Sequence, residues 1–229
     1  MENQRPARKR ARPAAASAPP GTAKSHPYHH GSLPDALLAA AETVLRRDGL
    51  RGLTLRAIAR EAGVSHTAPQ HHFGDTAGVL SELAASGHRR LTAAMAEHAA
   101  RAAPGAPRQK AIAHGYVDFA ATNPDLFRLM SRNELLDQDR PSLIAARRLS
   151  ASGLAGVFET QSREPGEAQG RKGGFGALSA SQAIAMTSAW SYVHGLASLL
   201  IDNRLRSLAA STGTFADARA LVDAVIEDL

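Results

Sequence analysis

LTLRAIAREAGVSHTAPQHHF, residues 53–73, is the most informative segment of this chain. The apolar residues of its first half recur at spacings of three and four, as on one buried helical face: Leu55, Ile58, Ala59 and Ala62. Gly63 follows where a tight turn needs a positive φ, and Ser65 is placed to cap a second helix. The pattern predicts helices over about 54–62 and 65–72, joined by a short turn. This is a helix-turn-helix, whose second helix enters the DNA major groove.

The chemistry of the second predicted helix suits base recognition. Its candidate base-reading residues are Ser65, His66, Thr67, Ala68, Gln70 and His71. A glutamine can bridge adenine, a hydroxyl can bond to either base of a pair, and a small methyl group can lie against thymine. Thr54 is expected to cap the first helix and leave donors for a phosphate, while Arg56, His29 and His30 are candidate phosphate contacts or plain solvated surface.

Two landmarks in this segment resemble the DNA-binding end of TetR-type regulators: Ala62-Gly63-Val64-Ser65 and His72-Phe73. The similarity extends upstream through Tyr28-His29-His30-Gly31 and downstream into a helix opened by Asp75. Farther along, Trp190-Ser-Tyr-Val-His194-Gly195 resembles the signature of the WHG class of TetR ligand-binding domains, and residues 116–130 also resemble that class. The chain departs from the family pattern at Gln70, usually Tyr, and at Thr76, usually Lys, which are positions that typically contact phosphates.

The resemblance implies an all-α fold with two functional parts. We expect a helix-turn-helix domain over residues 28–75 and a larger helical ligand-binding and dimerisation domain over residues 76–229, with a mobile loop at 162–176. Residues 1–27 are expected to form a disordered arm, since they are rich in Pro and Ala. Up to residue 30 the chain has six basic residues against the single acid Glu2. Such an arm can add salt-dependent DNA affinity, or it is a solubilising tail or a misassigned start.

Composition narrows the remaining function classes. Aromatic residues make up only 4% and no alternating β-branched runs occur, which favours helices. The absence of Cys excludes disulfides and thiol chemistry and fits the cytoplasm. No residue between Lys172 and Asp202 is charged, so this segment is long enough to span a membrane. We interpret it instead as a helix buried in a core or between subunits, and expect no membrane association.

The resemblance also implies a cavity and a dimer. Candidate cavity-lining residues are Tyr116, Phe119, Phe127, Met130, Phe158, Trp190 and His194, although each could be ordinary core. Candidate dimer contacts on the last two long helices, at about 179–204 and 215–228, are Ile184, Ala185, Ser188, Leu199, Leu221 and Val225. No cofactor is expected. His26, His29 and His30 lack Cys or carboxylate partners, so no metal site is predicted.

The leading hypothesis is therefore a ligand-responsive transcriptional regulator, most simply a repressor. It would bind a near-palindromic DNA operator as a homodimer and be released by a small, largely apolar molecule. One alternative is a protein that keeps the fold for interactions but binds DNA weakly or no longer. An enzyme is disfavoured because no nucleophile–base pair, carboxylate dyad or phosphate-binding glycine loop stands out in the sequence.

Overall fold

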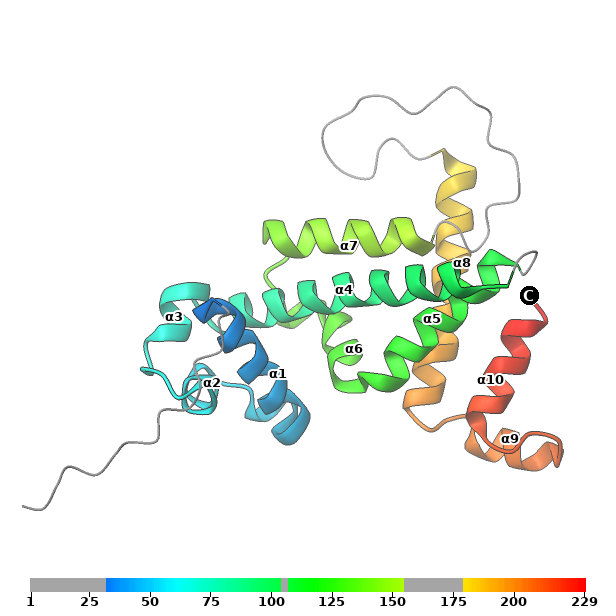
Figure 1. Ribbon diagram of the computed structural model, residues 1–229, viewed down its shortest axis with the longest axis horizontal. Coiled ribbons are helices and arrows are strands. Elements are labelled where there is room, and N and C mark those ends of the chain that lie inside the picture. The colour runs from blue at the N-terminus through cyan, green and yellow to red at the C-terminus, as the bar shows by residue number, and fades with distance from the viewer. Residues whose placement is uncertain (1–31, 104–106, 155–178) are drawn as a thin grey trace, which may run out of the picture. The chain divides into compact units, whose positions relative to one another are not determined.

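A computed structural model describes residues 32–103, 107–154 and 179–229. The chain divides into two units, residues 1–31 and 32–229, and all described residues belong to the second. Within the described ranges every regular element is a helix, which confirms the predicted all-α class (Figure 1). The expected arm at 1–27, the loop at 162–176, and the candidates His29, His30 and Phe158 lie outside the described residues.

The first three helices build the helix-turn-helix. They are α1 (Leu33–Gly52), α2 (Leu55–Ala62) and α3 (Ala68–Phe73). Helix α1 buries a stripe that includes Leu37, Ala41 and Val44, and α2 packs against it through Ile58 and Ala59. Because apolar residues at this spacing share one side of a helix, each short helix presents one face to a common core and the other to solvent.

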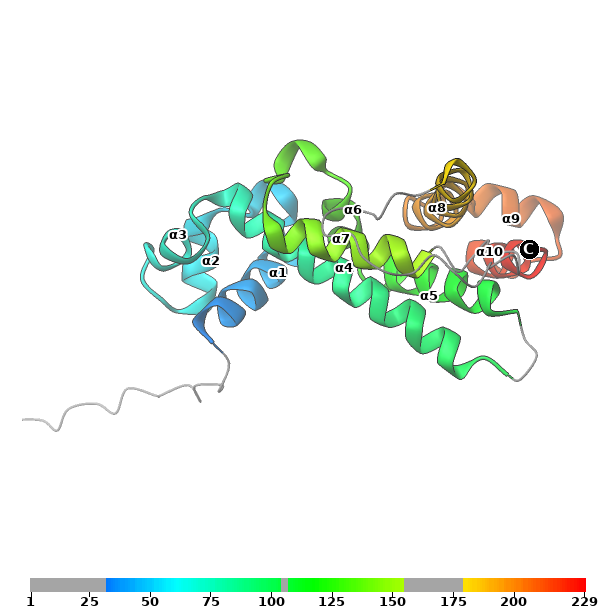
Figure 2. The ribbon, with the colours of Figure 1, turned by 90° about the horizontal axis from the view of Figure 1, so that it is seen from above.

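Helix α4 (Thr76–Arg101) is the element against which most others pack. Its first turn is capped by Asp75, whose carboxylate accepts a hydrogen bond from the Gly78 amide at 2.8 Å. A buried stripe then runs along the helix through Val79, Leu83, Leu91 and Met95. Helices α5 (Arg108–Thr122), α6 (Pro124–Met130) and α7 (Pro141–Leu154) all contact it (Figure 2).

The helices α8 (Ala180–Ile201), α9 (Arg206–Thr212) and α10 (Ala218–Glu227) complete the described chain. Helix α8 begins with a capping box formed by Ser179 and Gln182, near the start predicted for it. It ends at Ile201 rather than at residue 204, and the separate helix α9 follows. Neither α9 nor the 3₁₀ turn η1 (Asn133–Leu135) was predicted, because short helices give little periodic signal.

Helix α10 is held against α5 by both apolar and charged contacts. Val222 and Ile226 are fully buried. Arg219 forms ion pairs with Asp118 on α5 and with Asp223 one turn along its own helix, the latter at 2.9 Å. The predicted final helix at 215–228 is shortened to Ala218–Glu227 because Asp217 caps it, with its carboxylate accepting from the Ala220 amide at 2.8 Å.

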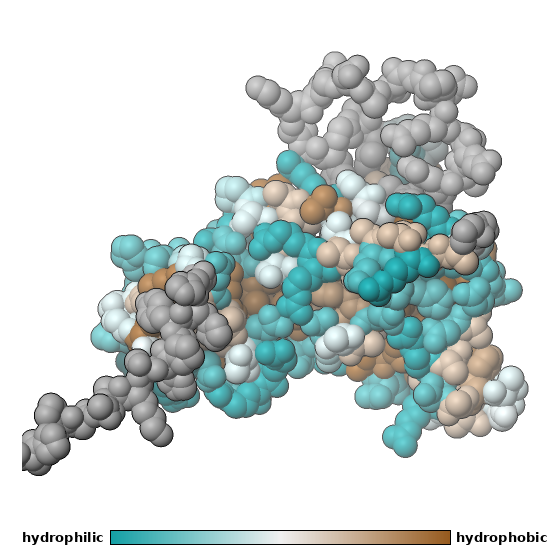
Figure 3. Space-filling view, viewed as in Figure 1, coloured by the Kyte–Doolittle hydropathy of each residue, from teal (hydrophilic) through white to brown (hydrophobic). Residues whose placement is uncertain are grey.

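Helix α8 is apolar but poorly covered by the rest of the described chain. By length and composition it is the one described helix that could cross a membrane, yet only 17% of its most apolar window is buried. Its Ile184 side chain is 67% exposed. Hydrophobic residues are also visible at the end of the molecule formed by α9 and α10 (Figure 3), where Leu208 is 56% exposed. A large exposed apolar face generally marks an interaction surface.

Candidate functional site

The turn of the helix-turn-helix has the geometry that the sequence predicts. Gly63 adopts a left-handed conformation, with φ +67° and ψ +31°, and ends α2. The amide of Val64 donates to the Ala59 carbonyl at 3.0 Å, and the Val64 side chain packs against the core. At the other end of α2, the Thr54 hydroxyl accepts from the Ala57 amide at 3.1 Å. The predicted cap and glycine turn therefore both form, and they set the direction in which the chain enters α3.

Helix α3 begins later than the sequence suggested. Ser65 does not cap it; instead the Ser65 hydroxyl lies 2.9 Å from that of Thr67, and the helix starts at Ala68. Pro69 thereby occupies the first turn, where a helix does not need its missing N–H. Residues 65–67 form the turn that leads into the helix. The predicted span of 65–72 is corrected to Ala68–Phe73.

The side chains proposed to read bases are on the surface. Ser65, His66, Thr67, Gln70 and His71 are exposed, whereas Ala68 is half-buried in the first turn of α3. Of the candidate phosphate contacts, Thr54 and Arg56 are exposed, and Thr76 is half-buried where α4 begins. The exposed residues of this set are accessible to a ligand as large as a DNA duplex. That each of them contacts DNA remains a prediction.

The C-terminal end of α3 is anchored from three sides. Phe73 is buried in the core with only 7% of its surface exposed. Its carbonyl oxygen lies against Gly78 of α4 so closely that a Cβ at that position would be 2.0 Å away. The guanidinium of Arg140 approaches the same oxygen at 3.5 Å. Because the first two contacts involve core and backbone atoms, they fix where α3 sits on α4, and Arg140 adds a side-chain contact.

The same Arg140 joins α3 to the helices behind it. Its Nε donates to the Glu82 carboxylate of α4 at 2.6 Å, and the Ser142 hydroxyl of α7 donates to that carboxylate oxygen at 2.8 Å. Both members of the ion pair are mostly buried, with 21% of each side chain exposed. Such charge-assisted bonds are stronger than neutral ones. The start of α7 is therefore tied to α4 next to the end of α3.

A second ion pair joins α1 to α4 and α6. Arg90 Nη1 of α4 lies 2.9 Å from both oxygens of Glu42 on α1, and Nη2 donates to Asn123, the residue before α6. The guanidinium also stands 5.9 Å from the ring centre of Phe119. Phe119 is therefore packed in the core under Arg90, and it does not line the cavity for which it was a candidate.

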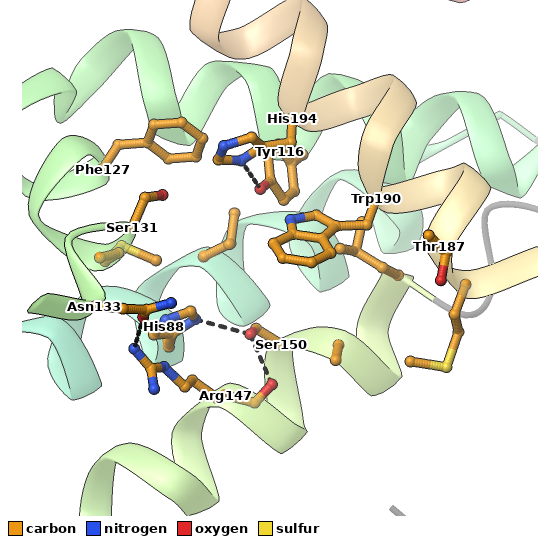
Figure 4. A pocket seen from close by; sticks show the side chains of 15 residues that line it. His88, Tyr116, Phe127, Ser131, Asn133, Arg147, Ser150, Thr187, Trp190 and His194 are labelled. Carbon is orange, nitrogen blue, oxygen red and sulfur yellow. Dashed lines mark hydrogen bonds between the residues drawn. The ribbon is translucent and has the colours of Figure 1, made fainter. Parts of the chain in front are cut away.

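A cavity of about 690 Å³ lies among α4, α5, α6, α7 and α8 (Figure 4). Its volume is within the range of small-molecule sites, roughly 300–1,000 Å³. The residues that line it are His88, Leu91, Tyr116, Phe127, Met130, Ser131, Asn133, Arg147, Ser150, Ala151, Leu154, Met186, Thr187, Trp190 and His194. Five of the sequence candidates are thus brought together: Tyr116, Phe127, Met130, Trp190 and His194.

Aromatic rings form one side of this cavity. The Tyr116 hydroxyl lies 3.0 Å from His194 Nδ1, and the Tyr116 and Phe127 rings meet edge to face with their centres 5.7 Å apart. Trp190 stands edge-on to this group, with its ring centre 5.9 Å from that of His194. Burial raises the pKa of the Tyr116 hydroxyl and lowers the pKa of His194. Both side chains are consequently neutral near pH 7, and they offer hydrogen bonds without charge.

Polar side chains form the other side. The Ser150 hydroxyl donates to the Arg147 carbonyl at 3.0 Å, so its oxygen accepts from Nδ1–H of His88, 2.9 Å away. Burial and, secondarily, the positive charge of Arg147 lower the pKa of His88 to about 4. His88 Nε2 is buried without a partner among the described residues. This histidine is therefore a neutral imidazole protonated at Nδ1.

Most of the polar cavity residues were not predicted from the sequence. Arg147, Ser150, Ala151 and Leu154 of α7 recur at i, i+3, i+4 and i+7, which is a helical face of mixed polarity. That spacing could have indicated a helix that lines a cavity, but it is equally typical of a helix that packs in a core. His88 and Leu91 of α4 carry the same ambiguity.

The proposed dimer residues differ in exposure. Ile184, Ser188 and Leu199 of α8 are exposed, whereas Ala185, Leu221 and Val225 are half-buried by the described part of the chain itself. All six retain some accessible surface on α8 or α10. Their participation in an interface remains a prediction.

Comparison with known proteins identifies the family. A family profile described as "Bacterial regulatory proteins, tetR family" matches residues 37–83, and one described as "Tetracyclin repressor-like, C-terminal domain" matches residues 109–229, more than half of the chain. Neither profile specifies the WHG class, which stays a prediction. A comparison with curated proteins gives no significant match.

Solved structures agree with these profiles. A protein of unknown function from Rhodococcus sp. RHA1 is 35% identical, with a TM-score of 0.63 over 89% of this chain and 96% of that one. The TetR family transcriptional regulator PfmR from Thermus thermophilus is 18% identical, with a TM-score of 0.54 over 86% and 95%. The multidrug binding protein EbrR, solved with imidazole, is 17% identical, with a TM-score of 0.53 over 86% and 94%. The last two share the fold. The chain belongs to the TetR family of bacterial transcriptional regulators.

Proposed function

We propose that this protein is a ligand-responsive repressor that binds a near-palindromic operator as a homodimer in the cytoplasm. The observation that carries the proposal is that one helix, α4, contacts both the recognition helix and the cavity. Its first turn packs on the recognition helix at Phe73, and its middle lines the cavity through His88 and Leu91. A shift of α4 would therefore move both the recognition helix and one wall of the cavity.

The exposed residues at the start of the recognition helix support DNA binding. Helix-turn-helix proteins place such residues in the major groove, and a two-fold dimer places two of these helices about one helical turn, or a multiple of it, apart. The departures at Gln70 and Thr76 remove phosphate contacts common in the family. We expect weaker binding with a lower salt dependence than in members that have Tyr and Lys there, unless the basic residues before position 30 compensate.

The apolar surface of α8 supports the homodimer. Ile184 and Leu199 are exposed on a helix that carries no charge, and α10 lies beside α8 in the described chain. A second copy would cover this surface and set the distance between the two recognition helices. The same arrangement accounts for the apolar length of α8 without a membrane.

Release by a ligand requires a difference in affinity. A ligand shifts DNA binding only as far as it binds one arrangement of the helices better than the other. The cavity offers contacts from α4, α7 and α8 to a single molecule, so its occupation can favour one spacing of these helices. The multidrug binding protein EbrR, solved with imidazole, shares this fold. A small molecule in the cavity is the effector that we propose here.

The DNA proposal is tested by gel shift with genomic fragments that the purified protein selects. We expect salt-dependent binding that is lost when His66 and Thr67 are both replaced by Ala. Ser207→Ala, which removes an exposed hydroxyl on α9, is the control and should bind normally. Folded protein that selects no fragment at low salt would favour the alternative, an interaction protein that keeps the fold without reading DNA.

A further inference from the structure

The cavity has an uneven distribution of charge. Among the described residues that line it there is no Asp or Glu, and Arg147 is the one side chain with a permanent charge. The two histidines of the lining are neutral near pH 7, because burial lowers the pKa of both His88 and His194. The described part of the lining therefore carries one net positive charge, at one side of the cavity, and none at the other.

The positive charge of Arg147 has no acidic partner among the described residues. Its Nη1 donates to Gln138 Oε1 at 2.6 Å and its Nη2 to Asn133 Oδ1 at 2.7 Å, and both acceptors are neutral amides. An arginine has five N–H donors, so three have no acceptor among the described residues. The two amides hold the guanidinium in place without neutralising it. Burial of part of this guanidinium lowers the pKa of Arg147, so some of its hydration is lost and an anion bound beside it would be favoured.

The opposite side of the cavity suits a flat apolar group. Phe127, Tyr116 and His194 lie across the cavity from the group formed by Arg147, Asn133, His88 and Ser150, with Trp190 between them (Figure 4). Aromatic rings favour edge-to-face or offset contacts with another ring. Leu91, Met130 and Met186 add apolar surface that can adapt to the shape of a bound molecule.

We propose that the cavity takes a small organic acid, with its carboxylate at Arg147 and a flat aromatic body against Tyr116, Phe127 and Trp190. The available donors of the guanidinium match the two oxygens of a carboxylate. His88 and Ser150, bonded to each other, lie beside this group as neutral polar surface. This inference rests on the proposed function, for which it names the chemical class of the effector.

The test compares two probes of the same shape, biphenyl-4-carboxylate and biphenyl-4-carboxamide. Trp190 is the only tryptophan of the chain and lines the cavity, so its fluorescence reports binding at this site. Titration calorimetry gives an independent affinity. We expect the acid to bind the full-length protein about tenfold to a hundredfold more tightly than the amide, as charge-assisted hydrogen bonds predict.

Two neighbouring arginines provide the variant and its control. Arg147→Gln should abolish the preference for the acid, while Arg148→Gln, an exposed residue with the same loss of charge, should retain it. Arg147→Lys keeps the charge but not the planar fork, and should retain part of the preference. Circular dichroism and thermal unfolding establish that each variant is folded.

The outcomes separate this inference from the proposed function. Equal binding of acid and amide, or a preference that survives Arg147→Gln in a folded protein, would overturn the acid proposal while leaving the cavity a ligand site. An acid preference that depends on Arg147, but with no effect of the acid on operator binding, would support the acid class and count against ligand-responsive repression. Binding of neither probe would overturn the acid proposal.

Discussion

Replacing Gly78 with alanine should displace the recognition helix. Gly78 lies in the first turn of α4, where the Cβ of an alanine would stand 2.0 Å from the carbonyl oxygen of Phe73 and 3.0 Å from Arg140 Nη1. Separations below 3.0 Å essentially never occur for a real Cβ, so the carbonyl has to move by about 1 Å. The neighbour is backbone at the end of α3 and cannot rotate away as a side chain could.

The size of the effect follows from two opposing contributions. Overpacking costs about 1–3 kcal/mol, and alanine recovers about 1 kcal/mol of helix propensity relative to glycine. The free energy of unfolding should therefore fall by about 0–2 kcal/mol. The larger change is expected in DNA binding, because a displaced α3 misaligns the side chains that we propose meet the bases. Losing one such contact costs about 1–3 kcal/mol, or roughly fivefold to 150-fold in affinity.

The assay is operator binding by fluorescence anisotropy, with urea unfolding of the same samples. Gly153→Ala is the matched control, because among the described residues its added Cβ would meet only the flexible terminal methyl of Met95, at 3.0 Å, far along α7. It should leave DNA affinity unchanged. A Gly78→Ala protein that binds the operator as tightly as the wild type would refute the claim that this contact positions α3.

Three further predictions concern single side chains. Ser81→Ala removes the buried hydroxyl that accepts from the Asp137 amide at 2.8 Å. In urea titrations it should lower the free energy of unfolding by about 1–2 kcal/mol, and an unchanged value would show that this hydrogen bond does not stabilise the fold. His88 has a pKa of about 4 when folded, against 6.5 unfolded, so the unfolded state takes up its proton first and wild-type stability falls as pH drops from about 6.5 towards 4. Relative to His88→Gln, the wild type should lose about 2–3 kcal/mol of its free energy of unfolding over this range. If the free energies of unfolding of the two proteins change with pH in parallel, the imidazole is not buried. Ile184→Asp should convert the proposed dimer to monomer in sedimentation experiments, whereas Leu208→Asp, at another exposed apolar position on α9, should not; the reverse order would place the interface elsewhere.

The parts of the fold that were predicted from the sequence are those governed by local chemistry. The Thr54 cap, the left-handed Gly63 and the Asp75 cap each depend on residues within a few positions, so the residue type alone indicates the conformation. The later start of α3 is also local in origin. It reflects the competition between Ser65, a good cap, and Pro69, which has to lie in the first turn.

The cavity could be predicted only in part because it depends on contacts between distant segments. Periodicity shows that Tyr116 and Phe119 are both buried, but not that one faces α8 while the other lies under Arg90 of α4. Likewise, no local pattern distinguishes Arg147, held by two amides at the cavity, from its solvent-exposed neighbour Arg148. The family resemblance indicated that a cavity exists; the three-dimensional packing of α4 and α7 determined its polar side.

The most direct test of the central claim is the selection of genomic fragments by the full-length protein at low salt, followed by determination of the enriched motif. Two exposed α3 helices in the proposed dimer predict a two-fold symmetric motif whose half-sites are separated by about one helical turn, or a multiple of it. A folded protein that enriches no sequence, or only an unsymmetrical one, would contradict the account.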